Sequence, residues 1–579
     1  MSILQSHQSV YGPRLDTYLN SMRAGAGVSR YRTEAPSERE IKYTINALND
    51  PANVSCATFE TILAMERSPE CAFLHLLQGP DSTVFPACMR LLRLYCDGGR
   101  ALFEYAYGYL CLQVISLAIN VAKLALVDQL WIIEQGAVQV GQHWDPPILI
   151  NNYSRKWEAL EFCKDENYLR PAARLLGWYT DPNTRLETCL PNIGGCTIED
   201  FDFIIKQLWV NRKSFLRAAK LSSGLFPWWC GLFHAMHNTL VTCWGTSMDR
   251  RGTPAEMDRW VHFLELTHRY SLCADKYEDA TLCYLLNNCP QFAGITYETT
   301  ATDTDDSAQI VAAYLEKMKQ LPILKWAYVS RLCGYVCANF HLDQPRYEDN
   351  LTLIASATLE EAWGEMLKAH EMNLIEWMLF VDTISNNSVT LPSMTEPQPS
   401  RAPLYLSVLT NDNLFELLGR VFMFPLLPEG RFIRDDSNRE WESHAREILR
   451  LIGPVVTNRL AKPNYKPDVR LIMAWNKTHQ CLLYHKYMST TLEARIRMYA
   501  TDWESVWHNL GDGLGITRRL DDSVRCGYFR CAVPNAPGLY QCARCGVKRY
   551  CSHRCQQADW GDIPSGHRLL CPSSLIVTK

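Results

Sequence analysis

Seven cysteines and one histidine lie near the C-terminal end of the sequence at spacings that suit metal binding. They follow the pattern C-x4-C-x10-C-x2-C-x5-C-x3-C-x11-H-x3-C. Zn²⁺ takes four thiolate or imidazole ligands in a closed tetrahedron, and closely spaced ligand pairs can reach one ion across a turn. Eight ligands therefore fill two zinc sites. The eight are Cys526, Cys531, Cys542, Cys545, Cys551, Cys555, His567 and Cys571.

The spacing also indicates which of two histidines is a metal ligand. Cys551 and Cys555 are four residues apart, which places both sulfurs on one face of a short helix, whereas His553 between them points elsewhere. His567 precedes Cys571 at the x3 spacing of a ligand pair. The alternative is a reduced, metal-free tail, but a segment this small has no substantial apolar core, and metal can supply on the order of 10 kcal/mol of folding free energy. We therefore expect the tail to fold around zinc.

These residues resemble the MYND-type zinc finger, which has an aromatic residue before the fifth cysteine and a Gln after the sixth that leads to a Trp. The sequence has Tyr550, Gln556 and Trp560 at these places. Two departures, C-x4-C at the first pair and a longer loop between Trp560 and His567, are similar to fungal members of the family. The resemblance implies interleaved pairs, with a first zinc on Cys526, Cys531, Cys551 and Cys555 and a second on Cys542, Cys545, His567 and Cys571.

The resemblance also implies a partner, because MYND fingers bind short proline-rich peptides in extended conformation. Gln556 and Trp560 are four residues apart on the expected short helix and share one of its faces. An indole beside an amide suits a polyproline-type peptide, which needs a flat apolar platform and a donor for its carbonyl groups. We therefore expect a protein partner bound through a proline-containing peptide. The alternative is that Trp560 merely covers a zinc site.

Charge argues against direct contact with nucleic acid. Residues 524–572 contain seven Lys or Arg and two Asp or Glu, and two zinc–thiolate sites would carry about −3 together, which leaves the finger about +2. The formal net charge of the whole chain is −4. The rest of the chain is thus acidic, and an acidic body is unsuited to a polyanion.

The rest of the sequence predicts a large, mainly α-helical body. Residues 36–50 place Ser37 three positions before Glu40, which is a capping-box signature, and apolar residues follow at helical spacing. Period-two strand patterns are scarce, and no fixed repeat is convincing, so an α-solenoid is one possible arrangement among others. Further helical patterns cover residues 58–66, 85–96, 201–220, 257–270, 308–321, 359–380, 412–424, 438–452 and 490–509.

A stretch rich in proline and small polar residues suggests the domain organisation. Residues 385–403 contain four prolines and many small polar residues, which favour an extended linker or loop. We therefore expect a helical body over residues 1–384, a helical C-terminal part of the body over 404–515, and the small two-zinc finger over 524–573.

Two uncharged stretches, residues 105–122 and 221–248, raise the question of a membrane. Both carry polar or helix-breaking residues, so buried helices are the better interpretation. The first residues lack the basic and apolar regions of a signal peptide. We expect a protein of the cytoplasm, the nucleus or both, with no membrane partner.

No sequence motif assigns an enzyme to the body. Only eight residues follow Cys571, and no cofactor motif of a SET methyltransferase is convincing upstream. His341 and Asp343 form an H-x-D pair without the strand pattern of iron-dependent hydroxylases, and we interpret His341 as a structural histidine. Phosphate-binding, dinucleotide-binding and hydrolase-elbow motifs are also missing. A further set with metal-ligand residue types lies in an aromatic stretch that is typical of a helix interior: Cys230, His234, His237 and Cys243.

We therefore predict a non-enzymatic, zinc-binding adaptor protein with a mainly α-helical body as scaffold. Its finger would bind proline-containing peptides, in transcriptional or ubiquitin-linked regulation. The alternative is an enzyme of unrecognised type in the body, such as a divergent methyltransferase, with the finger recruiting its substrate.

Overall fold

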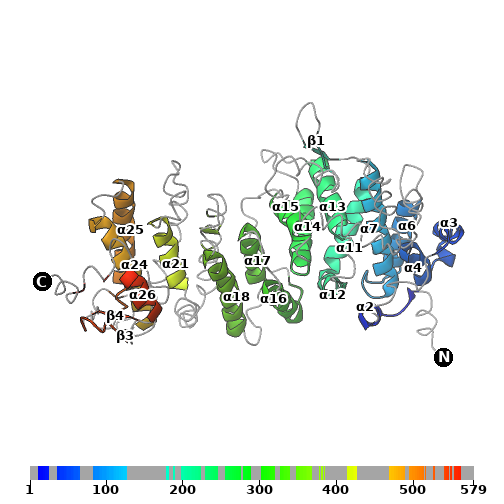
Figure 1. Ribbon diagram of the computed structural model, residues 1–579. Helices are drawn as coiled ribbons and strands as arrows, with labels where there is room; N and C mark the ends of the chain where they lie inside the picture. The colour runs from blue at the N-terminus through cyan, green and yellow to red at the C-terminus, as the bar shows by residue number, and fades with distance from the viewer. Residues whose placement is uncertain are drawn as a thin grey trace. The chain divides into compact units, whose positions relative to one another are not determined.

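The protein is mainly α-helical, as the sequence predicts (Figure 1). The structure is a computed structural model of the 579-residue chain. It describes residues 11–24, 36–64, 83–126, 178–180, 187–189, 197–222, 229–244, 254–274, 278–287, 301–319, 326–339, 347–367, 377, 380, 381, 384, 414–426, 469–488, 494–513, 515, 516, 526–528, 540–546, 548–550, 553–561, 567 and 571.

The chain divides into two compact units, Met1–Ala313 and Tyr314–Lys579. The division falls inside a helix, α16 (Thr304–Lys319). The linker that the sequence predicts at residues 385–403 lies outside the described residues, so the domain boundaries and the α-solenoid arrangement stay predictions.

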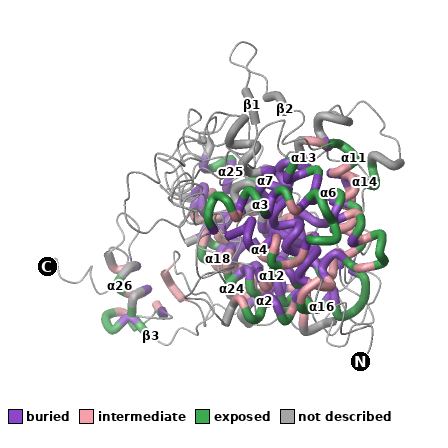
Figure 2. The backbone as a smooth tube through the Cα atoms, turned by 90° about the vertical axis from the view of Figure 1, so that its right-hand side faces the viewer, coloured by how far each residue is buried: buried purple, intermediate pink, exposed green. Residues whose placement is uncertain are grey.

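The first unit is built from helices whose buried faces form its core (Figure 2). Helix α6 packs on α7, α4 packs on α7, and α11 packs on α14. A short antiparallel hairpin joins β1 (Trp178–Thr180) to β2 (Glu187–Cys189). The helices are α2 (Leu15–Ala24), α3 (Glu38–Ala47), α4 (Cys56–Ala64), α6 (Val84–Asp97), α7 (Ala106–Leu126), α11 (Ile198–Val210), α12 (Arg212–Ser222), α13 (Trp229–Trp244), α14 (Pro254–Ser271) and α15 (Glu278–Asn287), together with the short 3-10 helix η1 (Pro51–Asn53).

Local capping chemistry sets where helices of this unit begin and end. The Ser37 side chain accepts a hydrogen bond from the Glu40 amide at 3.3 Å, which caps α3 as predicted. The predicted helix over residues 201–220 is instead two helices. Asn211 leaves the helical conformation, with φ −100° and ψ 22°, and its side-chain amide donates to the Gln207 carbonyl at 2.8 Å, so α11 ends there and α12 begins.

The first uncharged stretch contributes to helix α7, and residues 229–244 of the second form helix α13. Every residue from 106 to 119 in α7 is buried. Among the described residues, no helix has the length and apolar character that crossing a bilayer requires.

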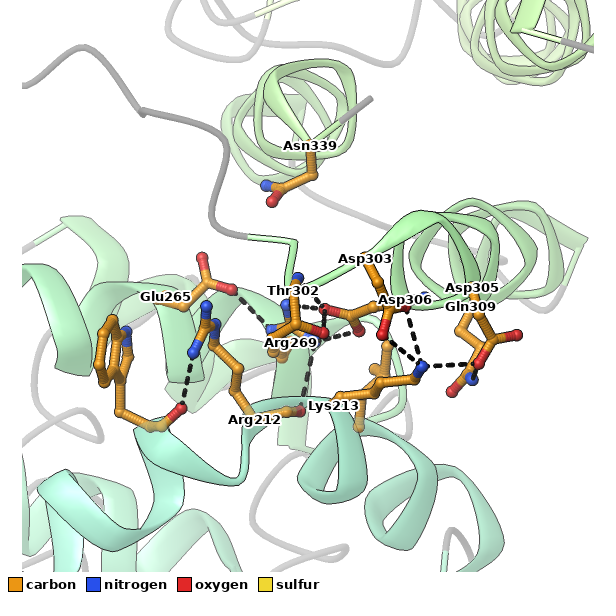
Figure 3. Close-up of polar contacts among 12 residues, drawn as sticks. Arg212, Lys213, Glu265, Arg269, Thr302, Asp303, Asp305, Asp306, Gln309 and Asn339 are labelled. Atoms are coloured by element: carbon orange, nitrogen blue, oxygen red, sulfur yellow. Dashed lines mark hydrogen bonds and ion pairs between the residues drawn. The ribbon is translucent and has the colours of Figure 1, made fainter. Parts of the chain in front are cut away.

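A buried ion-pair network joins α12, α14 and the start of α16 in the first unit (Figure 3). The fully buried Arg269 guanidinium donates to both carboxylate oxygens of Asp306, at 2.7 and 2.8 Å, and to Glu265 at 2.6 Å. The Thr302 amide also donates to Asp306 at 2.9 Å. Burial alone would raise the pKa of Asp306, but Arg269 holds that pKa below its ordinary value. These hydrogen bonds hold the start of α16 against α14 within the first unit.

The second unit contains α17 (Trp326–Ala338), α18 (Tyr347–Leu367), α21 (Leu414–Met423), the 3-10 turn η7 (Phe424–Leu426), α24 (Val469–Met488), α25 (Ala494–Gly513) and a small C-terminal segment described below. Helix α25 corresponds to the helix that the sequence predicts over residues 490–509 and continues to Gly513, while residues 490–493 lie outside the described residues. The predicted helix over residues 438–452 lies outside the described residues.

A reciprocal pair of tryptophans fixes α24 against α25. The indole of Trp475 donates to the Trp507 carbonyl, and the indole of Trp507 donates to the Trp475 carbonyl, both at 2.8 Å. Each bond pairs an indole N–H group that burial would otherwise leave without an acceptor. Gly511 makes the close approach possible, because a Cβ atom there would lie 2.3 Å from the Trp475 ring.

This packing leads to a stability prediction. Gly511→Ala should reduce the free energy of opening of α24 and α25 by about 1–3 kcal/mol, because the Trp475 ring must move or strain. Native-state hydrogen exchange of the two helices measures the change. The control is Gly364→Ala in α18, where a Cβ atom meets nothing within 4 Å, and there we expect a stabilisation of about 0.5–1 kcal/mol. Equal effects at the two glycines would contradict this account.

Candidate metal centre

The described residues of the C-terminal segment form a two-stranded antiparallel pair and one short helix. Strand β3 (Tyr540–Gln541) pairs antiparallel with β4 (Arg549–Tyr550), and helix α26 covers His553–Gly561. The Cys542 amide donates to the Lys548 carbonyl at 2.8 Å, and the Gly546 amide donates to the Cys542 carbonyl at 2.8 Å. Gly546 adopts a positive φ of 66°, which a residue with a side chain rarely takes. The resulting tight turn brings Cys542 and Cys545 together.

Four of the predicted ligands meet beside this turn. The candidate ligand atoms of Cys542, Cys545, His567 and Cys571 all lie within 4.8 Å of one another. Cys542, His567 and Cys571 are buried, and Cys545 is half-buried. Three thiols and one imidazole are the donor types of a closed structural zinc site.

Distances within the cluster fit zinc. With Zn–S at about 2.3 Å and Zn–N at about 2.0–2.1 Å, a tetrahedral site separates a sulfur from a nitrogen by about 3.5 Å. The Cys545 sulfur lies 3.3 Å from Nε2 of His567. In the part of the chain that the structure describes, this is the only set of three or more Cys, His, Asp or Glu side chains close enough to hold one ion.

The predicted first zinc site is described only in part. Cys526 is half-buried, and Cys555 is buried in α26, while Cys531 and Cys551 lie outside the described residues. Cys555 belongs to the same buried cluster as Cys542, Tyr550 and Cys571, and Cys526 packs against that cluster. The second ion and its four ligands therefore stay a prediction. His553 is exposed and its ring packs on Tyr540, with centroids 4.2 Å apart.

A buried carboxylate, which the sequence analysis does not single out, ties α26 to the hairpin. Asp559 is fully buried, and its Oδ2 accepts from Lys548 Nζ and from the Tyr550 hydroxyl, both at 2.8 Å. Burial, and then the Asp559 carboxylate, raise the pKa of Tyr550 well above its ordinary value, so the phenol remains a donor. Asp559 follows Cys555 by four residues, which places both on one face of the helix. This spacing is the sequence signal that could have suggested the contact.

Comparison with known protein families supports the same assignment. Residues 525–571 match the family described as the MYND finger. The C-terminal segment is a MYND finger. No curated protein and no solved structure matches the chain. The family match covers the ligand region alone, and the helical body has no recognised family.

Zinc binding and interaction with other proteins are the general properties of MYND fingers. In the MYND finger of this chain, the half-buried indole of Trp560 lies beside the metal cluster. Trp560, at the end of α26, is half-buried, and its ring centroid lies 6.1 Å from that of His567 at an interplanar angle of 69°. The guanidinium carbon of Arg544 lies 5.0 Å from the Trp560 ring centroid. Gln556 is also half-buried on α26. The structure thus places both predicted peptide-contact residues on the helix next to the metal ligands.

The other metal candidates of the sequence do not form a described site. His234 and His237 are buried in α13, and the His237 ring packs against Trp260 and Phe263 at centroid distances of 5.7 and 5.9 Å. This environment matches a helix interior, as expected. The side chains of Cys230 and Cys243, and the pair His341 and Asp343, lie outside the described residues.

Proposed function

We propose that the protein is a zinc-dependent adaptor whose MYND finger binds a proline-containing peptide of a partner protein. The observation that supports this proposal is the placement of Trp560, whose half-buried ring lies directly against the ligand His567. A ring held this way loses little conformational entropy on binding, and a proline ring can pack flat against it.

Two features fix the position of the Trp560 ring: the metal and the buried carboxylate of Asp559. Zinc, when bound, crosslinks the turn at Cys542 to the C-terminal end of the finger and supplies folding free energy. Asp559 fixes α26 on the hairpin through Lys548 and Tyr550. Trp560 follows Asp559 directly, so its position depends on both contacts. We propose two ions, with the eight predicted ligands.

The zinc ligands also bear on the cellular compartment in which the protein acts. Thiolate zinc sites persist in reducing compartments, so we propose that the protein acts in the cytoplasm or the nucleus. The helical body would act as scaffold or second binding surface, without catalysis, in transcriptional or ubiquitin-linked regulation.

Trp560→Ala tests the proposal. The substitution should reduce capture of proline-containing peptides at least tenfold, because it removes the platform, while the zinc content stays at the wild-type value. Fluorescence anisotropy with a labelled library of proline-containing peptides measures binding, and atomic emission measures zinc.

Tyr540→Ala is the matched control, since Tyr540 is an exposed aromatic residue of the same finger on β3. It should leave peptide binding within about twofold of the wild type. Gln556→Ala should weaken binding less than Trp560→Ala, because one hydrogen bond contributes about 0.5–1.5 kcal/mol. Unchanged peptide binding by Trp560→Ala, with zinc retained, would refute the peptide site and leave the zinc finger intact.

A further inference from the structure

Two histidines lie side by side on the surface of the α24–α25 pair in the second unit. His479 on α24 and His508 on α25 have ring centroids 5.7 Å apart at an interplanar angle of 55°. His479 lies one helical turn after Trp475, and His508 follows Trp507. The reciprocal Trp475 and Trp507 hydrogen bonds therefore fix the relative positions of both histidines.

Each imidazole has a carboxylate partner on one nitrogen. Nε2 of His479 lies 3.1 Å from Glu504 Oε1, and Nδ1 of His508 lies 3.4 Å from Asp512 Oδ2. Among the described residues, the other nitrogen of each ring has no protein partner. Histidines that bind metals have this arrangement, with one nitrogen toward the ion and the other fixed by a carboxylate.

The separation of the rings fits a shared ion. Two imidazoles that bind one ion at about 2.0–2.1 Å place their ring centres roughly 5–6 Å apart. The observed 5.7 Å lies within this range. Neutral imidazole is a good ligand for zinc, nickel and copper.

The surroundings also favour a cation. Glu504 and Asp512 bring two negative charges, and Lys486 pairs with one of them, with its Nζ 2.9 Å from Glu504 Oε2. Burial lowers the pKa of His479, which favours the neutral form of its ring. His479 is mostly buried, with 14% of its side chain exposed, whereas 44% of the His508 side chain is exposed, which gives an ion access from solvent.

We propose that His479 and His508 form a site for a divalent transition ion of the zinc and nickel class, separate from the MYND finger. The two free ring nitrogens would supply two ligands, and water would complete the coordination shell. Glu504 and Asp512 are positioning residues, which orient the two rings. The site rests on helices of the body and does not depend on the peptide-binding proposal.

Nickel titration of the intact, zinc-loaded protein tests the site. Ni²⁺ suits imidazole ligands, whereas the thiolate-rich finger retains its zinc. Isothermal titration calorimetry should show one Ni²⁺ site in the wild type that is lost in His479→Gln and in His508→Gln. Glu504→Gln keeps the side-chain shape but weakens the orientation of His479, so it should reduce Ni²⁺ affinity about 10–100-fold.

His262→Gln is the matched control. His262 is a half-buried histidine of the first unit that stacks on Trp209 at a centroid distance of 3.9 Å, and its loss should leave Ni²⁺ binding unchanged. Circular dichroism before titration establishes that each variant is folded. His508→Gln at a half-exposed position leaves the stacking of His479 on Trp475, at a centroid distance of 4.5 Å, in place. A wild type that binds no more Ni²⁺ than both histidine variants would overturn the proposal, and so would equal affinity in Glu504→Gln.

Discussion

Removal of zinc from the intact protein should unfold residues 525–571 while α24 and α25 keep their protection from hydrogen exchange. Where the structure describes the finger, it has two strands of two residues each and one short helix, and its buried cluster consists of cysteines and one tyrosine. Such a segment cannot fold on apolar burial alone. Structural zinc supplies about 10–16 kcal/mol of folding free energy at pH 7, as much as the total stability of a typical domain.

Hydrogen exchange of these segments with and without a chelator, measured by mass spectrometry, tests this prediction. Cys571→Ser should also lower zinc by at least one ion per chain, since Cys571 is a fully buried member of the ligand cluster. Cys481→Ser, at a buried cysteine of α24 outside the cluster, should leave the zinc content unchanged. A finger that stays protected after exhaustive chelation would be incompatible with a zinc-dependent fold.

Loss of Arg269 should be among the most destabilising single changes in the first unit. Arg269→Met leaves the carboxylates of Glu265 and Asp306 buried without their shared counter-ion. Removing one partner of a buried ion pair typically costs about 3–5 kcal/mol. The effect should appear as increased hydrogen exchange in α14 and in the first turns of α16.

A surface pair provides the comparison for Arg269. Arg217 contacts Asp16 at 2.8 Å, with 58% and 45% of the two side chains exposed. Arg217→Met should therefore cost no more than about 1 kcal/mol. If Arg269→Met were equally mild, the network would contribute little to holding α16. A triple variant, Arg269→Met with Glu265→Leu and Asp306→Leu, should recover part of the loss, because it removes the unpaired charges as well.

The features predicted correctly from the sequence depend on local chemistry. Ser37 caps α3 because a hydroxyl three residues before an exposed amide needs no distant partner. The cysteine pair at 542 and 545 meets across a turn for the same reason, and the family pattern then pairs it with His567 and Cys571. Apolar residues at helical spacing were sufficient to place most of the described helices.

The features that the sequence did not reveal depend on distant contacts. Arg269 and Asp306 are 37 residues apart, and nothing in either segment indicates the other. The Trp475 and Trp507 bonds need two helices in one particular register. Lys548 and Asp559 lie among polar residues that are typical of a protein surface, yet folding buries the carboxylate of Asp559. The break at Asn211 was missed because apolar periodicity continues across it.

The contact of Asp559 with Lys548 and Tyr550 has a consequence for protein engineering. A designer who grafts the metal ligands and Trp560 onto another scaffold, but not these three residues, would transfer a chelating loop whose indole has no fixed direction. The smallest transplantable unit of this finger therefore includes a lysine, a tyrosine and an aspartate that are not among the predicted metal ligands.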